Sequence, residues 1–443
     1  MEIKISEHFT YKKLFRFVFP SIMMMIFTSI YGVVDGLFVS NCVGDIPFAS
    51  INLVMPFIMI LGGMGFMIGS GGTALVAKTL GEGDREKANR YFSIMIELTI
   101  VMGIVLTVIG IVFMRPISYF LGATEAMIKD CVIYGRTVIA FTTAFMLQNV
   151  FQSFFIAAEK PKLGLWATVG AGVTNMVLDG VLIGILECGV EGAALATGIS
   201  QCVGGIIPFI YFTRKNSSLL RFKLTPLQIK PILRAFANGS SELMNNVSSS
   251  VVSMLYNFQL LRYIGEDGVS AYGVIMYVQF VFIAIFIGYS IGISPIVGYN
   301  FGAQAHNELK NILKKSVIFN GVAGVVLSIA AIFLSGPMSS IFVGYDKDLF
   351  ELTSHAFRIF APAFLFSGFN IFASGFFTAL NNGVISAVIA FLRTLVFQTA
   401  SILILPLIIG SDGIWISIFV AEIFAFLISV FFVVIKRSKY KYY

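Results

Sequence analysis

Residues 168–186 read TVGAGVTNMVLDGVLIGIL, a run long and apolar enough to cross a bilayer, yet it carries Asn175 and Asp179. A carboxylate near the middle of a spanning helix costs about 2.5–3.5 kcal/mol on insertion scales, so it persists where it faces protein or water. Asn175 and Asp179 are spaced i, i+4 and therefore share one helix face. A second acid, Asp35, lies in the first apolar run, IYGVVDGLFVS. We expect Asp35, Asn175 and Asp179 to form an interior site for a proton or another cation, because two close carboxylates in a low dielectric do not both ionise cheaply.

The composition of the chain indicates a membrane protein. Of its 443 residues, 57% are hydrophobic and only 12% are charged, whereas soluble domains carry about 25% charged residues. The apolar runs are too long and continuous for barrel strands, so we expect an all-α polytopic protein with twelve transmembrane helices. The expected helices span roughly residues 14–40, 50–77, 91–114, 131–157, 163–186, 190–212, 231–262, 269–298, 315–336, 354–378, 384–409 and 413–435.

The basic residues indicate the orientation. The net charge of +7 does not point to nucleic acid, because most of the 30 Lys and Arg residues fall in alternate segments between the apolar runs. The positive-inside rule then predicts a multi-pass protein of the cytoplasmic membrane with both termini in the cytoplasm.

The sequence contains an internal repeat at an offset of 221 residues, half the chain length. The matched pairs are Gly71 with Gly292, Gly81 with Gly302, Pro116 with Pro337, Asn149 with Asn370, Phe151 with Phe372, Ser153 with Ser374, Gly189 with Gly410 and Gly192 with Gly413. Each half holds six helices, so the halves have the same orientation and are related by an axis along the membrane normal. We expect an N-terminal lobe at 1–212, a cytoplasmic linker at 213–230 and a C-terminal lobe at 231–443.

With these features the chain resembles the multidrug and toxic compound extrusion (MATE) transporters. The resemblance rests on the two six-helix halves, the loop LGEGDREKAN after the second run, its counterpart FGAQAHNELKN, and NMVLDGVLI in the fifth. It implies a V-shaped pair of lobes and an antiporter that exports lipophilic, often cationic compounds in exchange for protons or sodium. In the bacterial multidrug-pump branch that the chain resembles, acids on helices 1 and 5 and the helix 5 asparagine line a cavity. Asp35, Asn175 and Asp179 match that pattern and are the expected ion-coupling residues.

The seventh apolar run is the most polar of the twelve. In NGSSELMNNVSSSVVSM, polar residues recur at spacings of three or four and draw a stripe along one helix face; they are Asn238, Ser241, Asn245, Ser249 and Ser253. We expect Glu242, Asn245 and Ser249 to line a substrate cavity, together with Gln148 and Gln152 of the fourth helix. The alternative for this stripe is interhelical hydrogen bonding, worth about 0.6 kcal/mol per contact in membranes.

Another branch of the family uses an acid on helix 7 and one on helix 10. Here helix 10 has no internal acid, and Glu351 lies only at its outer approach. This departure argues against a sodium site in the C-terminal lobe.

Other chemistries find no support in the sequence. Arg136, Arg358 and Arg393 fall within helices and are expected to snorkel or to pair with carbonyls. The four cysteines lack metal-ligand spacing; a disulfide remains open, but isolated thiols are favoured. No Walker A, GxSxG or HExxH motif occurs, so we expect neither an ATP-driven pump nor an enzyme, and no cofactor beyond the coupling ion, H⁺ or Na⁺.

One other function stays open on these grounds. A flippase or exporter of lipid-linked saccharides, or of another amphiphilic metabolite, would need a strongly basic cavity for a pyrophosphate group. Such a cavity is more strongly basic than Arg136 and Arg393 supply. The expected partners are small amphiphilic or cationic substrates and the bilayer, and we expect the protein to act as a monomer.

Overall fold

The apolar runs form long helices because a backbone in hydrocarbon must satisfy its hydrogen bonds within the segment. The computed structural model describes residues 3–442, apart from the side chains of Asn41 and Asp45, and this part of the chain contains no β-strand. The first lobe is built from α1 (Tyr11–Cys42), α2 (Asp45–Gly81), α3 (Arg85–Phe120), α4 (Ile128–Ala140), α5 (Thr142–Ala157), α6 (Pro161–Leu178) with the π-helix η1 (Asp179–Ile185), and α7 (Gly189–Thr213).

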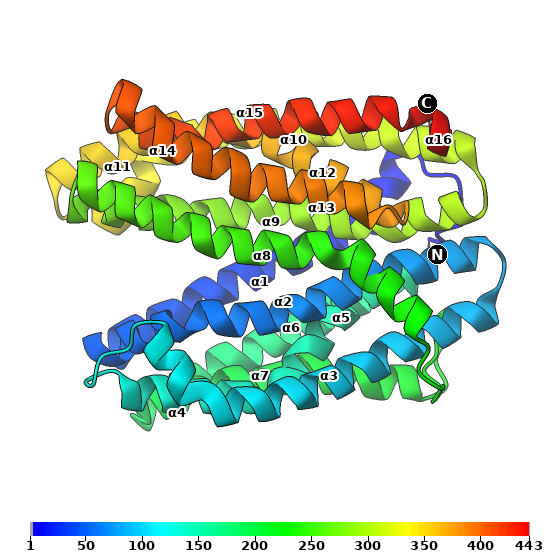
Figure 1. Cartoon of the computed structure of the whole chain (residues 1–443), viewed down its shortest axis with the longest axis horizontal. Coiled ribbons are helices and arrows are strands. Elements are labelled where there is room, and N and C mark those ends of the chain that lie inside the picture. The colour runs from blue at the N-terminus through cyan, green and yellow to red at the C-terminus, as the bar shows by residue number, and fades with distance from the viewer. Residues whose placement is uncertain (1–2, 443) are drawn as a thin grey trace.

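The second lobe repeats this plan (Figure 1). Its elements are α8 (Ile229–Tyr263), α9 (Glu266–Gly302), α10 (His306–Val343), α11 (Lys347–Phe360), the 3₁₀ turn η2 (Ala361–Ala363), α12 (Phe364–Ala379), α13 (Gly383–Phe391), the π-helix η3 (Leu392–Phe397), α14 (Gln398–Ile409), α15 (Asp412–Ile435) and the short α16 (Arg437–Tyr440).

The helices have the length and composition of membrane spans. Within residues 3–442, ten spans are long and apolar enough to cross a membrane, and the bent pair α4 and α5 makes an eleventh. The remaining long helix is α8, with 35 residues, whose polar stripe keeps it out of that set. The expected twelve helices in two lobes are therefore present.

Two of the expected helices are interrupted. We expected one continuous helix over residues 131–157, but α4 and α5 meet at Phe141 with a bend of 53°. The expected helix over 354–378 is likewise broken by the 3₁₀ turn at Ala361–Ala363, which contains Pro362. Phe141 and Pro362 are 221 residues apart, so the interruption belongs to the repeat.

The buried apolar residues fall into three clusters that are arranged as a V. One cluster contains side chains of both lobes, such as Phe154 and Phe376, and lies at the end of the molecule that carries both termini, which we call the termini side. Toward the opposite end, the far side, each lobe has its own cluster, around Tyr134 in the first lobe and around Trp415 in the second. The lobes therefore share a core at the termini side and have separate cores at the far side.

Glycines of the repeat make the contact at the termini side close. A Cβ at Gly81 of α2 would lie 1.9 Å from the carbonyl oxygen of Tyr299, and a Cβ at Gly302 of α9 would lie 2.0 Å from that of Lys78. These two positions are repeat partners, so α2 and α9 cross symmetrically between the lobes. No larger residue fits at either position while the lobes stay closed here.

The segment between the lobes, residues 214–228, is not helical and lies along α3. Amides of alternate linker residues donate to side chains spaced four apart on α3: Arg221 to Asn89 (2.8 Å), Lys223 to Ser93 (3.0 Å) and Thr225 to Glu97 (2.8 Å). The match is geometric, because two extended residues advance about 6.6 Å and four helical residues about 6.0 Å.

The residues before α1 connect the two lobes. The amide of Ile5 donates to Glu159 of the first lobe at 2.7 Å. His8 and the amide of Phe9 both contact the carboxylate of Glu308 in the second lobe, at 2.6 and 2.9 Å. We call residues 3–10 the N-terminal strap.

Candidate functional site

A close crossing of α1 and α6 builds the site in the first lobe. A Cβ at Gly172 would lie 2.5 Å from the ring of Phe27 and 2.8 Å from that of Tyr31, so only glycine lets α1 approach α6 this closely. Asp35 lies one turn beyond Tyr31, and Asn175 lies one turn beyond Gly172. The crossing therefore brings together side chains that are 140 residues apart in the sequence.

The three expected ion-coupling residues lie in one group. The amide nitrogen of Asn175 donates to Oδ1 of Asp35 at 3.4 Å. The carboxyl groups of Asp35 and Asp179 lie close enough to interact electrostatically. Asp179 is fully buried and is the first residue of the π-helix η1, a type of helical irregularity that is frequent at functional sites.

The group is rich in buried oxygens that lack a donor. Both carboxylate oxygens of Asp179 and the Oδ1 of Asn175 are buried without a hydrogen-bond partner within the described residues. A buried acceptor without a donor costs about 1–3 kcal/mol, and more when it is charged. The arrangement of these oxygens beside Asp35 is suited to a proton or to a small cation that prefers oxygen ligands.

Two tyrosines lie beside the acids, and the sequence reasoning missed them. Tyr31 neighbours Asp35 and Gln148, and the fully buried Tyr134 of α4 neighbours both acids and Thr197 of α7. The position of Tyr31, one turn before Asp35 on the same helix, was a signal for it in the sequence. Tyr134 lies on another helix and had no such signal.

The two expected cavity glutamines of the first lobe are buried. Gln148 packs on Gly204 of α7, where a Cβ would lie 2.6 Å from its side chain. Gln152 has a buried Oε1 without a hydrogen-bond partner among the described residues, and both glutamines line a narrow crevice between α5, α6 and α7. Gln148 reaches the acid group through Tyr31, whereas Gln152 lies one turn away along α5.

The polar stripe on α8 divides into two parts. Near the termini side it joins α8 to its own lobe, because Asn238 donates to Asn381 at 2.7 Å and Ser241 contacts Thr378 at 3.5 Å. These two residues make the interhelical hydrogen bonds that were the alternative for the stripe.

Farther along α8, the three expected cavity residues have polar groups that are exposed or lack a hydrogen-bond partner among the described residues. Glu242 makes no side-chain hydrogen bond or ion pair with the described residues, and the Oδ1 of Asn245 is buried without a partner. Ser249 is exposed. The structure thus leaves the carboxylate of Glu242 available near the junction of the lobes, where Asn246 contacts α2 at Gly63.

The second lobe holds a buried ion pair that the sequence reasoning did not find. Arg393, in the π-helix η3, makes a bidentate contact with Glu422 of α15, at 2.7 and 2.9 Å to Oε1 and 3.1 Å to Oε2. Asn370 donates to the same carboxylate at 2.7 Å. Glu422 is 2% exposed, so its charge is balanced entirely inside the lobe. The signal in the sequence was a lone acid in the middle of the last apolar run.

The repeat shows that the two lobes differ at this level. At an offset of 221 residues, Asp35, Asn175 and Asp179 correspond to Tyr256, Val396 and Ala400, so the second lobe has no copy of the acid group. Conversely, Arg393 and Glu422 correspond to Gly172 and Gln201. Asn149 and Asn370 are alike, since each donates to a backbone carbonyl, of Gly62 and of Glu422.

The remaining candidate groups are two arginines and four cysteines. Arg136 donates to the carbonyl of Ile111 at 3.0 Å, and Arg358 donates to Ser335 at 3.3 Å. The thiols of Cys42, Cys131, Cys188 and Cys202 are all free. Within residues 3–442, no three His, Cys, Asp or Glu side chains are grouped so as to hold a metal ion.

Comparison with known proteins agrees with this architecture. The multidrug export protein MepA of Staphylococcus aureus (strain MSSA476) is 24% identical over 432 residues, which cover 97% of this chain and 94% of that protein. MepA of Staphylococcus haemolyticus (strain JCSC1435) is 24% identical over 439 residues, which cover 98% and 95%.

Solved structures share the fold. A MATE protein in complex with MaL6 matches with a TM-score of 0.93 and 20% identity, over 99% of this chain and 98% of that one. A multidrug resistance MATE family transporter in an outward-facing conformation matches with a TM-score of 0.92 at 20% identity and the same coverage. The model of the MatE family matches residues 20–181 and 243–402, which include most of both lobes. The chain therefore belongs to the multidrug and toxic compound extrusion (MatE) family of membrane transporters.

Proposed function

We propose that this protein is a cation-coupled antiporter that exports lipophilic, often cationic compounds across the cytoplasmic membrane. The observation that carries the proposal is the set of buried oxygens on Asn175 and Asp179 that have no donor among the described residues and lie beside Asp35. Two neighbouring carboxyl groups in a low dielectric hold a proton or another cation between them. The coupling ion is H⁺ or Na⁺.

The asymmetry of the lobes supports coupling in the first lobe. In the second lobe, Arg393 neutralises Glu422 with a cation that is part of the chain. In the first lobe no Lys or Arg pairs with Asp179 in the described structure, so its positive partner comes from solution. An exchangeable partner is what ion coupling requires, whereas a tethered one gives a fixed charge.

The closed termini side supports a mechanism of alternating access. In the proposed cycle the termini side faces the cytoplasm, and the ion reaches Asp35 and Asp179 from the far side. Occupancy changes the local charge by one unit, α1 moves against α6, and the substrate loses its site and leaves outward. The lobes then close at the far side and open at the termini side, where the ion is released and a new substrate enters.

The free energy that drives export depends on how many cations enter for each substrate that leaves. One proton exchanged for one monovalent cation moves no net charge, so only the pH gradient contributes, at about 1.4 kcal/mol per unit. A second inward cation adds about 2.3 kcal/mol per 100 mV of membrane potential.

Substrate contacts are proposed for polar groups of α8 near the junction of the lobes. The carboxylate of Glu242, which pairs with no described residue, attracts a cationic compound, and Asn245 and Ser249 on the same helix supply hydrogen bonds. Gln148 and Gln152 serve this role in the first lobe. Because one chain contains both lobes and the whole acid group, we propose that the monomer is the working unit.

The alternative, a flippase or exporter of lipid-linked saccharides, has weaker support. It requires basic side chains that are free to hold pyrophosphate within the membrane. Arg393 is committed to Glu422, and Arg136 donates to a backbone carbonyl. Near the junction of the lobes, the carboxylate of Glu242 has no paired cation among the described residues, which favours a cationic substrate.

The experiment that tests the proposal is export by Asp179→Asn in vesicles, with a fluorescent cationic dye and an imposed H⁺ or Na⁺ gradient. Loss of the exchangeable charge is expected to reduce gradient-driven export at least about a hundredfold, as for removal of an essential group worth about 2.7 kcal/mol. Asp267→Asn, an exposed acid in the first turn of α9, is the matched control and keeps export. Undiminished, gradient-dependent export by Asp179→Asn contradicts the proposal.

A further inference from the structure

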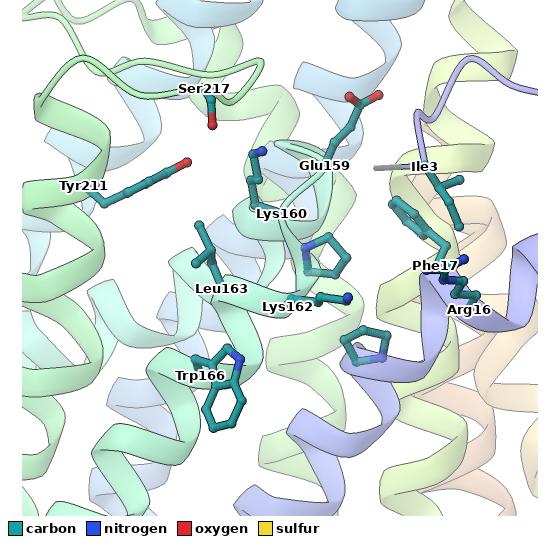
Figure 2. A pocket seen from close by; sticks show the side chains of 12 residues that line it. Ile3, Arg16, Phe17, Glu159, Lys160, Lys162, Leu163, Trp166, Tyr211 and Ser217 are labelled. Atoms are coloured by element: carbon teal, nitrogen blue, oxygen red, sulfur yellow. The ribbon is translucent and has the colours of Figure 1, made fainter. Parts of the chain in front are cut away.

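One cavity in the structure lies outside the proposed transport site. Its volume is about 560 Å³, and it opens at the termini side of the first lobe, between the start of α1, the turn from α5 to α6, the end of α7 and the linker. Figure 2 shows Lys162 extending across it toward Arg16 and the start of α1. Neither the ion-coupling residues nor the proposed substrate contacts line this cavity.

The charged groups of the cavity are mainly basic. Arg16 and Lys162 make no hydrogen bond or ion pair with any described residue, so two positive charges face one cavity without a counterion. The one acid among the described lining residues, Glu159, accepts a hydrogen bond from the backbone amide of Ile5 at 2.7 Å, which directs its carboxylate toward the N-terminal strap. The cavity therefore favours an anion and disfavours the cationic compounds proposed as export substrates.

An uncommitted donor lies in the wall. The hydroxyl group of Tyr211 is buried and has no hydrogen-bond partner within residues 3–442. A buried hydroxyl without a partner loses about 1–3 kcal/mol relative to a paired one, so a ligand that supplies an acceptor here is stabilised. Figure 2 shows this hydroxyl pointing into the cavity from α7, on the side opposite the start of α1.

The cavity also has an apolar side. Phe17 and Pro20 of α1 are buried in its wall, and Trp166 of α6 is 68% exposed at its edge. An exposed tryptophan beside basic residues at one end of a membrane span is typical of the interface between head groups and hydrocarbon. A ligand with a charged head and an apolar tail matches this combination, whereas a small hydrophilic anion leaves the apolar side unused.

We propose that this cavity binds a phosphate group, and that the phosphate is the head group of an anionic amphiphile of the adjacent leaflet. Arg16 and Lys162 pair with the phosphate oxygens, the Tyr211 hydroxyl donates to one of them, and the chain lies along Trp166. The proposed phosphate site depends on the proposed orientation of the protein in one respect: that orientation makes the adjacent leaflet the cytoplasmic one.

Binding is tested without transport. The full-length protein is purified into nanodiscs of phosphatidylcholine with a low fraction of phosphatidylglycerol, and the lipids that it retains are counted by native mass spectrometry. A separate arm uses water-soluble glycerol 3-phosphate in phosphatidylcholine nanodiscs. Because this readout does not depend on the coupling ion, failure of the antiport proposal leaves its outcome unaffected.

The variant Arg16→Gln/Lys162→Gln is expected to bind phosphatidylglycerol about tenfold more weakly or worse, since two charges near the membrane surface are lost. Lys12→Gln/Lys314→Gln removes two exposed charges at the same end of the molecule but outside the cavity, and is expected to bind normally. Tyr211→Phe keeps both charges and is expected to weaken binding severalfold, which covers the case in which the double variant fails to fold.

The outcomes separate the sources of the phosphate. Retention of phosphatidylglycerol that depends on Arg16, Lys162 and Tyr211 supports the lipid. Binding of glycerol 3-phosphate with the same dependence, without retained lipid, supports the phosphate site but assigns it to a soluble ligand. Equal binding of phosphatidylglycerol by the cavity variants and by Lys12→Gln/Lys314→Gln overturns the proposal, as does the absence of binding in both arms.

Discussion

At the scale of single residues, the two lobes hold buried charge in different ways. Glu422 has a partner in its own lobe, and the bidentate geometry with Arg393 and the bond from Asn370 fill most of its acceptor sites. Asp179 has no such partner among the described residues. The same physical cost of a charge in a low dielectric is met internally in one lobe and, as proposed, by an exchangeable ion in the other.

Removing one residue of the Arg393–Glu422 pair leaves the other buried without its partner. We expect Glu422→Gln to lower the free energy of unfolding by about 3–5 kcal/mol, because Arg393 is left buried without a counterion. The double variant Arg393→Met/Glu422→Leu is expected to recover most of that loss. The measurement is thermal unfolding in detergent followed by the fluorescence of Trp415, which is 2% exposed on the same helix.

Glu191→Gln is the control for this experiment, because Glu191 is an exposed acid in the first turn of α7. An unchanged melting temperature for Glu422→Gln would mean that the pair carries no stability.

The residues of the acid group were predictable from the sequence one by one, but their arrangement was not. The cost of a carboxylate in hydrocarbon singles out Asp35 and Asp179, and the i, i+4 spacing adds Asn175. Their approach depends on Gly172, whose role appears only when the ring of Tyr31 packs on it. Glu422 was missed because its partner lies on another helix, 29 residues earlier. The functional roles of Glu242, Asn245, Ser249, Gln148 and Gln152 remain predictions.

At the scale of helices, apolar length predicted which elements exist, and side-chain packing decided where they break. The break at Phe141 has no proline or glycine beside it, so nothing local in the sequence marks it, whereas Pro362 marks the matching break in the second lobe. The π-helices at Asp179–Ile185 and Leu392–Phe397 likewise have no sequence signature. An extra residue within a turn shows only in the backbone hydrogen bonds.

The crossing of α2 and α9 leads to a prediction about these elements. Gly302→Ala places a Cβ within 2.0 Å of the carbonyl oxygen of Lys78, so we expect the lobes to separate at the termini side. Spin labels at exposed Glu86 and Asn307, in a background with the native cysteines replaced, are expected to show a longer distance in the variant.

Gly273→Ala on the same helix is the matched control, because a Cβ there meets nothing within 4 Å. If Gly302→Ala gives the same distance distribution as Gly273→Ala, this contact does not hold the lobes closed.

At the scale of the whole molecule, the N-terminal strap joins the lobes where they close. Glu308 accepts the amide of Phe9, and Asn311 donates to the carbonyl of Phe9 at 3.0 Å, while the amide of Ile5 is held by Glu159 across the junction. Lys315 also donates to the Phe9 carbonyl. The strap therefore opposes separation of the lobes at the termini side.

We expect Glu308→Ala to release the strap. A hydrogen bond to a charged group contributes about 1.5–3 kcal/mol, so the amide of Phe9 should exchange with solvent about ten to a hundred times faster. Hydrogen exchange measured by mass spectrometry checks this over residues 3–10. Glu7→Ala removes a partly exposed acid whose partners among the described residues are the nearby Lys13 and Lys4, and should leave exchange at Phe9 unchanged. Equal exchange in both variants would exclude a holding role for Glu308.

The pairing of the linker with α3 limits where one half of the protein swings on the other. The fifteen residues between α7 and α8 are enough for a flexible linker. Three of their amides, however, are hydrogen-bonded to α3, and the last of these is the amide of Thr225. Only residues 226–228 remain before α8 begins at Ile229. The flexible connection between the lobes is therefore the short segment 226–228, which starts at the surface of the first lobe. Insertions just after Thr225 should lengthen this segment, whereas insertions at 215–217 should not.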